Sequence, residues 1–457
     1  MNIYIRIEIR RRELEGRLLL ALAAAERGHD VLLGDLDALL SHRLWLRPGI
    51  FHDKSLTPTS GKIALHRRLA AAGFLVTSQD EEHGLGDATY DAFAQRRFGP
   101  ETLHTATTAF CWGPHDRDAL VEMYSEHADR FSMSGSPRVD LWRPEFRRRR
   151  PPMRPVDVEG DRPIVLVAPG SRPFIPHPFW VAMEDLRPRQ FRSHDDDREW
   201  GHYRKFAEAY QYVGRLVRGI RLAAHAFPET VFVVRPHPKS PDGAWEAVLG
   251  SAENIIVTRE GDAAGPWLDA ARALIHNGST TAAEAAMMGV PVVSFQPQGE
   301  RSDRFTNRVG AVARDEDELL ALIAGARDGR ATTSVDADRR VLEERLSVDP
   351  ERLSADRIVD VWEAAEQPGL GRPNRLAAAS AASRAHRRVG TVRAGVRRTL
   401  RGGSPRRSIG IDATPKFPPL TTDAITELAD GLRRALGRFD GVDVTLVGRR
   451  LVRIRPR

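Results

Sequence analysis

The sequence has very little cysteine and no long apolar run. Cys111 is the single cysteine among 457 residues, which rules out an intramolecular disulfide and a metal site built from several thiolates. The longest apolar stretches, such as residues 18–25, are far shorter than the roughly 20 residues of a membrane-spanning helix. At the N-terminus Ile5 and Ile7 alternate with charged residues, whereas a secretory signal has a continuous apolar core. We therefore expect a cytoplasmic globular protein in which Cys111 is a small buried hydrophobe.

Acidic residues are missing from one segment, residues 371–407. This segment contains eleven Arg and no Asp or Glu, and subtracting it from the formal charge of +7 leaves −4 for the remainder. A nucleic-acid-binding core would spread its cations over the folded surface, so nucleic acid is not an expected partner. The segment has the imperfect pattern of an amphipathic helix suited to an anionic membrane surface at the inner face of the cell membrane. A basic linker is the alternative that the same residues allow.

The chain is too long for one hydrophobic core, so two domains with an extension are expected. Short apolar runs alternate with helical periodicity over residues 3–133 and again over 163–295, which predicts α/β domains with parallel sheets. The predicted fold is two Rossmann-like domains with a deep crevice between them, where ligands are expected. The predicted parts are a first domain over residues 1–146, a linker over 147–160, a second domain over 161–366, an Ala- and Arg-rich basic segment over 367–407 and a small α/β appendage over 408–457.

The strongest motif is the segment over residues 273–295. A predicted strand ends at His276, a tight turn follows at Gly278, and a helix then begins with three hydroxyl residues and carries an acid one turn later. Helix N-termini offer free N–H groups to a phosphate, and a carboxylate beyond them accepts from ribose hydroxyls. An ordinary capped helix is the alternative. The predicted nucleotide-binding residues of this motif are His276, Gly278, Ser279, Thr280, Thr281 and Glu284.

A second turn suited to phosphate follows the predicted strand over residues 231–234. His237 lies between two prolines there, with a cation on either side, where it can donate a hydrogen bond to a phosphate oxygen. A rigid charged surface turn is the alternative. The predicted nucleotide-binding residues of this turn are Arg235, His237, Pro238 and Lys239.

Three acids, Asp80, Glu81 and Glu82, come directly after the predicted strand over residues 74–78. Adjacent carboxylates repel one another, which raises the pKa of one of them toward that of a useful general base. A solvated acidic loop is the alternative. No Asp-x-Asp pair suited to a metal-bound diphosphate follows a predicted strand, and the pair over residues 195–197 lies in a predicted long loop over residues 172–197. We therefore expect no metal and no cofactor besides a donor substrate.

The two phosphate-suited turns resemble the nucleotide-binding half of GT-B glycosyltransferases, and they are similar to the motifs of bacterial sialyltransferases and capsule enzymes that use CMP-sugars. In those families the His-Pro and Ser/Thr motifs hold the nucleotide phosphate, which implies this role for His237, Pro238, Ser279 and Thr280. The same families carry an acidic-acidic-Gly motif whose carboxylate is the general base. Here His83 separates the acids from Gly84, so the resemblance leaves the choice among the three acids open.

A broader resemblance, to the surface carbohydrate biosynthesis protein family, covers almost the whole chain. It rests on residues 4–28, Asp53-Lys54-Ser55, the three acids, residues 135–140 with 143–145, and Lys416-Phe417-Pro418. This resemblance implies the pathway, which is surface carbohydrate synthesis, more specifically than it implies the reaction.

Three further residues, Glu8, Arg10 and Arg138, are expected to face the crevice and contact substrate. Glu8 and Arg10 follow the first strand, and Arg138 could pair with an anionic sugar carboxylate or phosphate. The alternative for Glu8 and Arg10 is a surface charge pair. The alternative for Arg138 is a turn stabilised by an Arg–Asp pair.

The hypothesis is a metal-independent glycosyltransferase in which residues 1–146 bind a carbohydrate or lipid-linked acceptor and residues 161–366 bind a nucleotide sugar, with a CMP-sugar favoured. One of the three acids removes the proton of the acceptor, and His237 stabilises the leaving phosphate. The rivals are a CDP-linked glycerophosphate or polyol-phosphate transferase, a UDP-sugar epimerase, and a non-catalytic scaffold of an envelope-synthesis complex.

Overall fold

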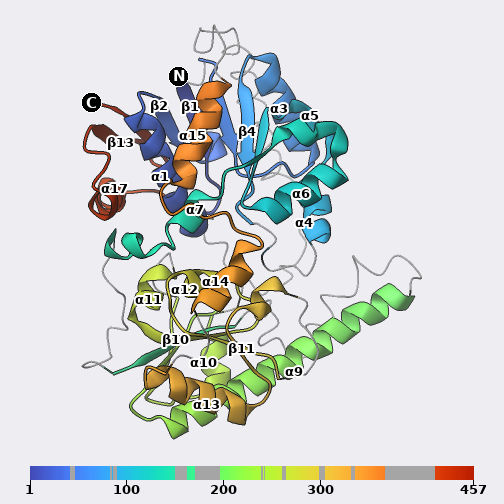
Figure 1. The fold of residues 1–457 in the computed structure, drawn as a ribbon, viewed down its shortest axis with the longest axis vertical. Coiled ribbons are helices and arrows are strands. Elements are labelled where there is room, and N and C mark those ends of the chain that lie inside the picture. The colour runs from blue at the N-terminus through green and yellow to red at the C-terminus, as the bar shows by residue number, and fades with distance from the viewer. Residues whose placement is uncertain are drawn as a thin grey trace, which may run out of the picture. The chain divides into compact units, whose positions relative to one another are not determined.

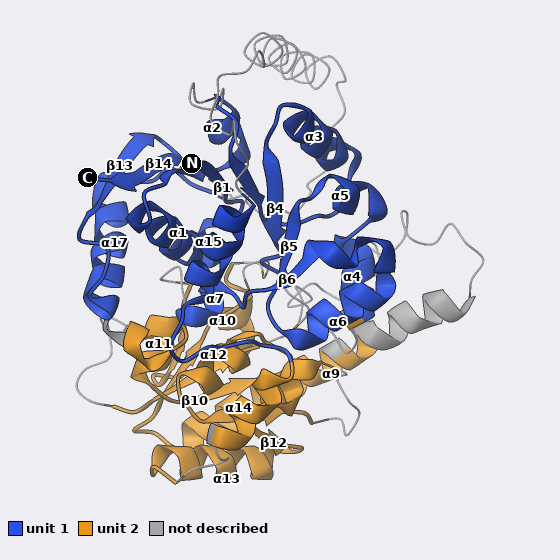
Figure 2. Ribbon diagram, turned by 45° about the horizontal axis from the view of Figure 1, so that its top comes forward, with its two compact units in different colours: residues 1–83, 91–141, 345–457 blue, residues 84–90, 142–344 orange. Residues whose placement is uncertain are grey.

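The computed structural model describes the chain as two compact units (Figures 1 and 2). Unit 1 comprises residues 1–83, 91–141 and 345–457, and unit 2 comprises residues 84–90 and 142–344. The described residues are 1–41, 47–82, 85, 90–149, 162–169, 196–237, 240, 242–259, 264–297, 304–330, 335–365 and 417–457.

Unit 1 is built on an eight-stranded sheet. Its strands are β1 (Asn2–Arg6), β2 (Asp30–Gly34), β3 (Ile50–Asp53), β4 (Leu75–Gln79), β5 (Thr108–Cys111), β6 (Phe131–Met133), β13 (Val442–Gly448) and β14 (Leu451–Pro456). They lie in the order β13-β14-β2-β1-β3-β4-β5-β6. The strands β2, β1, β3, β4, β5 and β6 are parallel to one another, and Ile3 of β1 lies beside both Val31 and Ile50. The strand order reverses between β1 and β3, so the expected ligand site of this sheet is outside the carboxyl ends of these two strands.

Helices cover both faces of the unit 1 sheet. They are α1 (Arg10–Glu26), α2 (Leu36–Ser41), α3 (Ser60–Ala71), α4 (Tyr90–Arg97), α5 (Pro100–Thr105), α6 (Pro114–Met123), η3 (Ser125–Arg130), α7 (Pro137–Asp140), α15 (Ser354–Ala364) and α17 (Thr422–Leu436). Helix α1 is buried on nearly every side because it contacts β2, β14, α7 and α15. Its Leu- and Ala-rich sequence suits this position, since a helix that is apolar all round belongs in a core.

The C-terminal part of the chain returns to unit 1. Strand β14 pairs antiparallel with β2, and β13 pairs with β14, so both strands extend the N-terminal sheet. The Arg453 guanidinium lies 2.9 and 2.6 Å from the two carboxylate oxygens of Asp30. Helix α15 also packs on unit 1, where the Trp362 indole donates to the Thr77 hydroxyl at 3.1 Å.

This arrangement corrects the predicted boundaries. Residues 354–364, predicted to belong to the second domain, lie in unit 1, and residues 417–457 complete a sheet instead of forming a separate appendage. The pairing partner of β14 is more than 400 residues away in the chain, which is why local sequence patterns did not reveal it.

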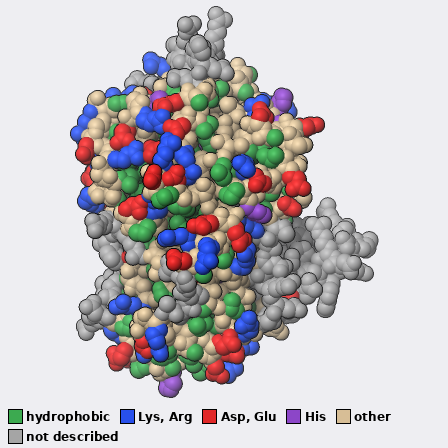
Figure 3. Space-filling view, viewed as in Figure 1, with side chains coloured by type: hydrophobic (Ala, Val, Ile, Leu, Met, Phe, Trp, Pro, Cys, Tyr) green, Lys and Arg blue, Asp and Glu red, His purple; other side chains and the backbone are tan. Residues whose placement is uncertain are grey.

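On the face seen in Figure 3, basic and acidic side chains are intermixed, in keeping with ion pairs such as Arg438–Asp356.

Unit 2 is built on a six-stranded parallel sheet. Its strands are β7 (Ile164–Ala168), β8 (Val231–Val234), β9 (Ile255–Val257), β10 (Ala271–His276), β11 (Val292–Phe295) and β12 (Ala311–Ala313). They lie in the order β12-β11-β10-β7-β8-β9, which is the Rossmann order of two three-strand halves meeting at β7 and β10. The predicted α/β fold with two Rossmann-like units is therefore confirmed.

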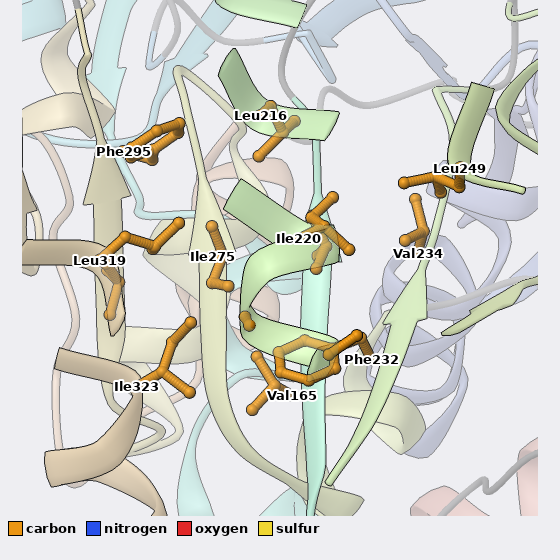
Figure 4. Packing of buried hydrophobic residues seen from close by; sticks show 14 of the residues in the cluster. Val165, Leu216, Ile220, Phe232, Val234, Leu249, Ile275, Phe295, Leu319 and Ile323 are labelled. Atoms are coloured by element: carbon orange, nitrogen blue, oxygen red, sulfur yellow. The ribbon is translucent and has the colours of Figure 1, made fainter. Parts of the chain in front are cut away.

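Helices flank the unit 2 sheet as well. They are η4 (Pro144–Arg149), α9 (Asp196–Ala226), α10 (Ala244–Leu249), α11 (Gly265–Ala270), α12 (Thr281–Met287), η5 (Phe305–Arg308), α13 (Glu316–Arg327) and α14 (Val335–Glu343). Leu216 and Ile220 of α9 and Leu319 of α13 pack against Ile275 and Phe232 of the sheet (Figure 4). This core holds the carboxyl ends of the strands in register.

Three predictions fall wholly or mostly outside the described residues: the basic segment over 371–407, Pro238 with Lys239, and the long loop over 172–197. Asp196 and Asp197, the last residues of that loop, begin α9. Within the described ranges, no helix combines the length and the apolarity that crossing a membrane would require.

Candidate functional site

Unit 2 places the two predicted phosphate turns on either side of one strand. The turn with Arg235 follows β8 and the turn with Gly278 follows β10, and both strands pair directly with β7. The order of the sheet reverses between β7 and β10. Ligands of open α/β sheets bind outside the carboxyl ends of strands at such a reversal, so both turns lie where a nucleotide is expected.

The turn after β8 presents a cation and a histidine. The backbone N–H of Arg235 donates to the Val167 carbonyl at 2.9 Å, and its guanidinium lies 5.4 Å from the centre of the Trp267 ring. The His237 side chain is exposed, while its carbonyl accepts from the Ser240 N–H at 2.8 Å. The backbone at Arg235 and His237 is thus hydrogen-bonded, and the His237 imidazole is accessible to solvent.

The turn after β10 requires glycine. Gly278 has a φ of +64°, and a side chain here would collide with that of Arg304, which donates to the Gly278 carbonyl at 3.2 Å. The Ser279 hydroxyl accepts from the Thr281 N–H at 3.3 Å, whereas the N-cap residue of α12 is Thr280, whose side chain makes no capping hydrogen bond. Thr280 is exposed, and Ser279 and Thr281 are half-buried.

Two residues of this turn lie deeper than predicted. His276 is fully buried, burial lowers its pKa to about 4, and its Nε2 is 3.5 Å from the Val309 carbonyl. It is a neutral core residue, because the side chain of this last strand position points into the unit, and not a surface phosphate ligand. Glu284 is 9% exposed, and its carboxylate lies next to Gly265 at the start of α11 and close to the Arg149 guanidinium.

Two residues of unit 2 were not anticipated from the sequence. Asn307 accepts through its side-chain oxygen from the Gly278 N–H and donates to the Asn277 side chain, while Arg304 lies over the same turn. Both belong to the segment that follows β11, and Asn307 is 29 residues after Gly278 in the sequence. Only the pairing of β10 with β11 brings that segment to the turn.

In unit 1 the three predicted acids have three different environments. Asp80 accepts two hydrogen bonds from the Arg97 guanidinium, at 2.7 and 3.1 Å, and one from the Glu82 N–H at 2.8 Å. Glu82 is 41% exposed in its side chain and lies 3.2 Å from both Arg12 and Arg97. Burial would raise the pKa of Glu82, but these two cations lower it below the ordinary glutamate value.

Glu81 is the acid with a raised pKa. It is buried, and its Oε1 lies 2.7 Å from the Nε of Arg17. Burial raises the pKa of Glu81 and the negative charge of Glu13 adds to this, so the two effects outweigh the attraction of Arg17. Its Oε2 has no hydrogen-bond partner among the described residues. A carboxylate of this kind is suited to accept a proton.

Two further residues predicted to contact substrate, Arg138 and Arg10, belong to helices of unit 1. Arg138, in α7, donates from Nη1 to the Glu81 carbonyl at 3.3 Å. Asp140, at the end of α7, accepts from the N–H and the hydroxyl of Ser354, at 2.7 and 2.9 Å. Arg10 is the first residue of α1, because β1 ends at Arg6 and not beyond it.

Glu8 joins a second charged cluster, centred on Asp53 at the end of β3. Its Oε2 is 2.5 Å from the Lys54 Nζ, and Arg6 connects Glu8 to Asp53. Strand β3 was not predicted because its apolar run is only two residues long, so Asp53 and Lys54 entered only through the family resemblance. Among the described residues, no group of three or more His, Cys, Asp or Glu side chains is arranged to hold a metal ion.

No protein-family model and no curated protein matches the chain. Similar solved structures include a UDP-N-acetylglucosamine 2-epimerase from Neisseria meningitidis bound to UDP-GlcNAc, at 11% identity and a TM-score of 0.46, covering 80% of this chain and 100% of that one. A UDP complex of MnaA from S. aureus has 12% identity and a TM-score of 0.45, with coverage of 80% and 99%. A variant of the wall teichoic acid polymerase TagF has 10% identity and a TM-score of 0.45, with coverage of 80% and 88%. The sheets and the two charged sites define the class of protein as an α/β chain of two Rossmann-like units.

Proposed function

We propose that this chain is a glycosyltransferase of surface polysaccharide synthesis. Unit 2 binds an activated nucleotide sugar and unit 1 binds a carbohydrate or lipid-linked acceptor. The observation that carries the proposal is the position of the two turns after β8 and β10, which flank β7 at the reversal of the unit 2 sheet. Surface polysaccharide as the pathway, and a CMP-sugar as the favoured donor, come from the family resemblance.

In the proposed reaction Glu81 removes the proton of an acceptor hydroxyl. The acceptor oxygen forms a bond to the anomeric carbon while the bond between that carbon and the nucleotide phosphate oxygen breaks. The phosphate leaves with the bonding electron pair. Arg235, His237 and the hydroxyls of Ser279 and Thr280 stabilise the negative charge of the leaving phosphate.

The assignment of Glu81 as the base rests on its environment. A general base works best when its pKa is near the operating pH, and burial moves Glu81 in that direction. Asp80 is engaged by Arg97 through two hydrogen bonds, and Glu82 has a lowered pKa. The lowered pKa makes Glu82 a weaker base, and both Asp80 oxygens already accept from Arg97.

The first test is nucleotide binding to the full-length protein. We expect at least one of CMP, CDP, UDP and GDP to raise the Tm of the wild type, and His237→Ala to reduce that shift. The control His225→Ala, at the exposed end of α9 before β8, should leave the shift unchanged. A CMP-selective shift supports the favoured donor, and a UDP-selective shift replaces it by a uridine-linked one. No shift with any nucleotide would overturn the proposal and leave the scaffold as the explanation.

The second test identifies the product formed with the preferred donor. Transfer to a carbohydrate acceptor supports the proposal. Conversion of a UDP-sugar to its epimer without acceptor would assign the chain to the epimerases, and release of CMP with formation of a phosphodiester would assign it to the glycerophosphate or polyol-phosphate transferases. Either of these two results overturns glycosyl transfer.

A further inference from the structure

Asp53 is the buried anchor of the second charged cluster in unit 1. It is fully buried and uses both carboxylate oxygens. Oδ1 accepts from the Arg6 guanidinium at 3.0 Å and the Lys54 N–H at 2.7 Å, while Oδ2 lies 3.0 Å from Lys62 Nζ and 2.8 Å from His66 Nε2. A buried carboxylate with this many donors fixes the cations around it, because losing any partner would leave charge uncompensated.

Lys62 is fully engaged in this anchor. Besides Asp53, its ammonium donates to the Ser55 carbonyl at 2.6 Å and to the Ser55 hydroxyl at 3.1 Å. An ammonium has three donors, and all three are used. Lys62 therefore supports the cluster and offers nothing to a ligand.

Arg6 and Lys54 differ from Lys62 because both also face Glu8. The Glu8 Oε2 lies 2.5 Å from Lys54 Nζ and 3.7 Å from Arg6 Nη2, so one oxygen contacts cations that follow two neighbouring strands. The Glu8 side chain is 27% exposed, whereas that of Arg6 is 15% and that of Lys54 is 10% exposed. The Nε of Arg6 is buried and has no hydrogen-bond partner within the described part of the chain. Glu8 is thus the most solvent-accessible member of a group in which Asp53 holds the guanidinium of Arg6 and the backbone N–H of Lys54.

We propose that Arg6 and Lys54 form an anion-binding subsite and that the Glu8 carboxylate occupies it when no ligand is bound. The subsite lies at the carboxyl ends of β1 and β3, where the strand order of the unit 1 sheet reverses. A phosphate or carboxylate that displaces Glu8 meets the guanidinium that Asp53 holds and the Lys54 ammonium that Glu8 had paired. If the proposed function holds, the ligand is an anionic group of the acceptor, so the acceptor is a phosphate- or carboxylate-bearing carbohydrate.

The test compares Glu8→Gln with the wild type for binding of small anions. Inorganic phosphate, glycerol 3-phosphate and glucuronate are titrated into the full-length protein, with neutral glycerol as the reference, and binding is followed by NMR or calorimetry. Removing the competing charge of Glu8 should tighten anion binding by roughly tenfold, because Arg6 and Lys54 then lack an internal carboxylate. Tighter binding of glycerol 3-phosphate than of glucuronate identifies a phosphate group, and the reverse identifies a carboxylate.

Two further variants control for general charge effects and for misfolding. Lys54→Gln should weaken anion binding by roughly tenfold or more, and its far-UV circular dichroism should match the wild type. Asp443→Asn removes the same charge from an exposed ion pair with Arg457, on the edge strand β13, and should change nothing. Equal anion affinity in the wild type and Glu8→Gln, or no anion binding in either, overturns the subsite.

Nucleotide binding measured on the same proteins separates this inference from the proposed function. A nucleotide-dependent Tm shift without anion binding overturns the subsite alone. Anion binding that responds to Glu8→Gln without any nucleotide-dependent shift supports the subsite and overturns the glycosyltransferase.

Discussion

The Glu81 carboxylate lies 2.7 Å from the Arg17 guanidinium, and both side chains are buried. Arg17 comes from α1, which also carries the buried Glu13. Burial and the charge of Glu13 raise the pKa of Glu81 although Arg17 opposes them. The helix after the first strand therefore controls the basicity of a carboxylate that follows the fourth.

Replacing Glu81 tests its role as the base. Glu81→Gln keeps the shape of the side chain and removes the proton acceptor, so we expect kcat to fall by about 100-fold or more. The matched variant Glu82→Gln, one residue away and with a lowered pKa, should lower kcat by less than about tenfold. Initial rates with saturating donor and acceptor measure both. A larger loss for Glu82→Gln would transfer the role of base to Glu82.

The pH profile tests the same assignment without removing the group. The base acts when it is deprotonated, so the rising limb of kcat/KM should lie above the ordinary glutamate pKa of 4.5. Arg17 lowers the pKa of Glu81, and Arg17→Gln should therefore move the limb to still higher pH. Arg17→Lys should restore it, because the positive charge returns. A limb that is the same in all three proteins would rule out Glu81 as the titrating group.

His237 tests the nucleotide half of the site. Its exposed imidazole at the end of β8 is assigned to the leaving phosphate, so His237→Ala should lower turnover by roughly tenfold or more. His225→Ala removes an exposed histidine of the same unit and should keep wild-type turnover. Near-wild-type turnover of His237→Ala would be incompatible with the assigned role.

Asp53 should contribute strongly to the stability of unit 1. Asp53→Asn removes the fully buried carboxylate that pairs with Arg6 and Lys62, so we expect the free energy of unfolding to fall by about 3–5 kcal/mol. Asp118→Asn, in an exposed pair with Arg117, should cost much less, because solvent screens an exposed ion pair. Urea denaturation at neutral pH measures both changes, and equal small losses would show that the cluster does not stabilise the fold.

The Asp53 contribution should also depend on pH. Burial would raise the pKa of Asp53, but Lys62, His66 and Arg6 hold it well below its usual value. A carboxyl with a depressed folded pKa stabilises fully above its unfolded pKa of about 3.9 and loses this contribution as the pH falls through the folded value. The difference in unfolding free energy between the wild type and Asp53→Asn should thus be constant above about pH 5 and shrink in stronger acid.

The position of the C-terminal strands is tested by a pair of valines. Val452 of β14 is fully buried, so Val452→Asp should destabilise the protein by several kcal/mol, about the cost of burying an unpaired polar group. Val447 of β13 is 39% exposed, and Val447→Asp should have little effect. Thermal unfolding distinguishes them, and equal Tm values would contradict the pairing of β14 with β2.

Local patterns in the sequence were enough to predict most strands and helices. The strand over residues 231–234 has the predicted bounds, and the helix predicted to begin with the three hydroxyl residues begins at the last of them, Thr281. The turns at Arg235 and Gly278 follow strands as predicted, because a strand end and a glycine are readable from neighbouring residues. The α/β class follows from the alternation of these elements.

Only the tertiary structure decided which distant residues meet. It brought Arg304 to Gly278, Arg17 to Glu81 and Glu8 to Lys54, and it placed β14 against β2. It also buried His276, which the sequence could not distinguish from a surface ligand. Composition and periodicity depend on neighbours along the chain, whereas burial, pKa and ion pairing depend on strand order and side-chain direction, which are fixed only when the sheets assemble.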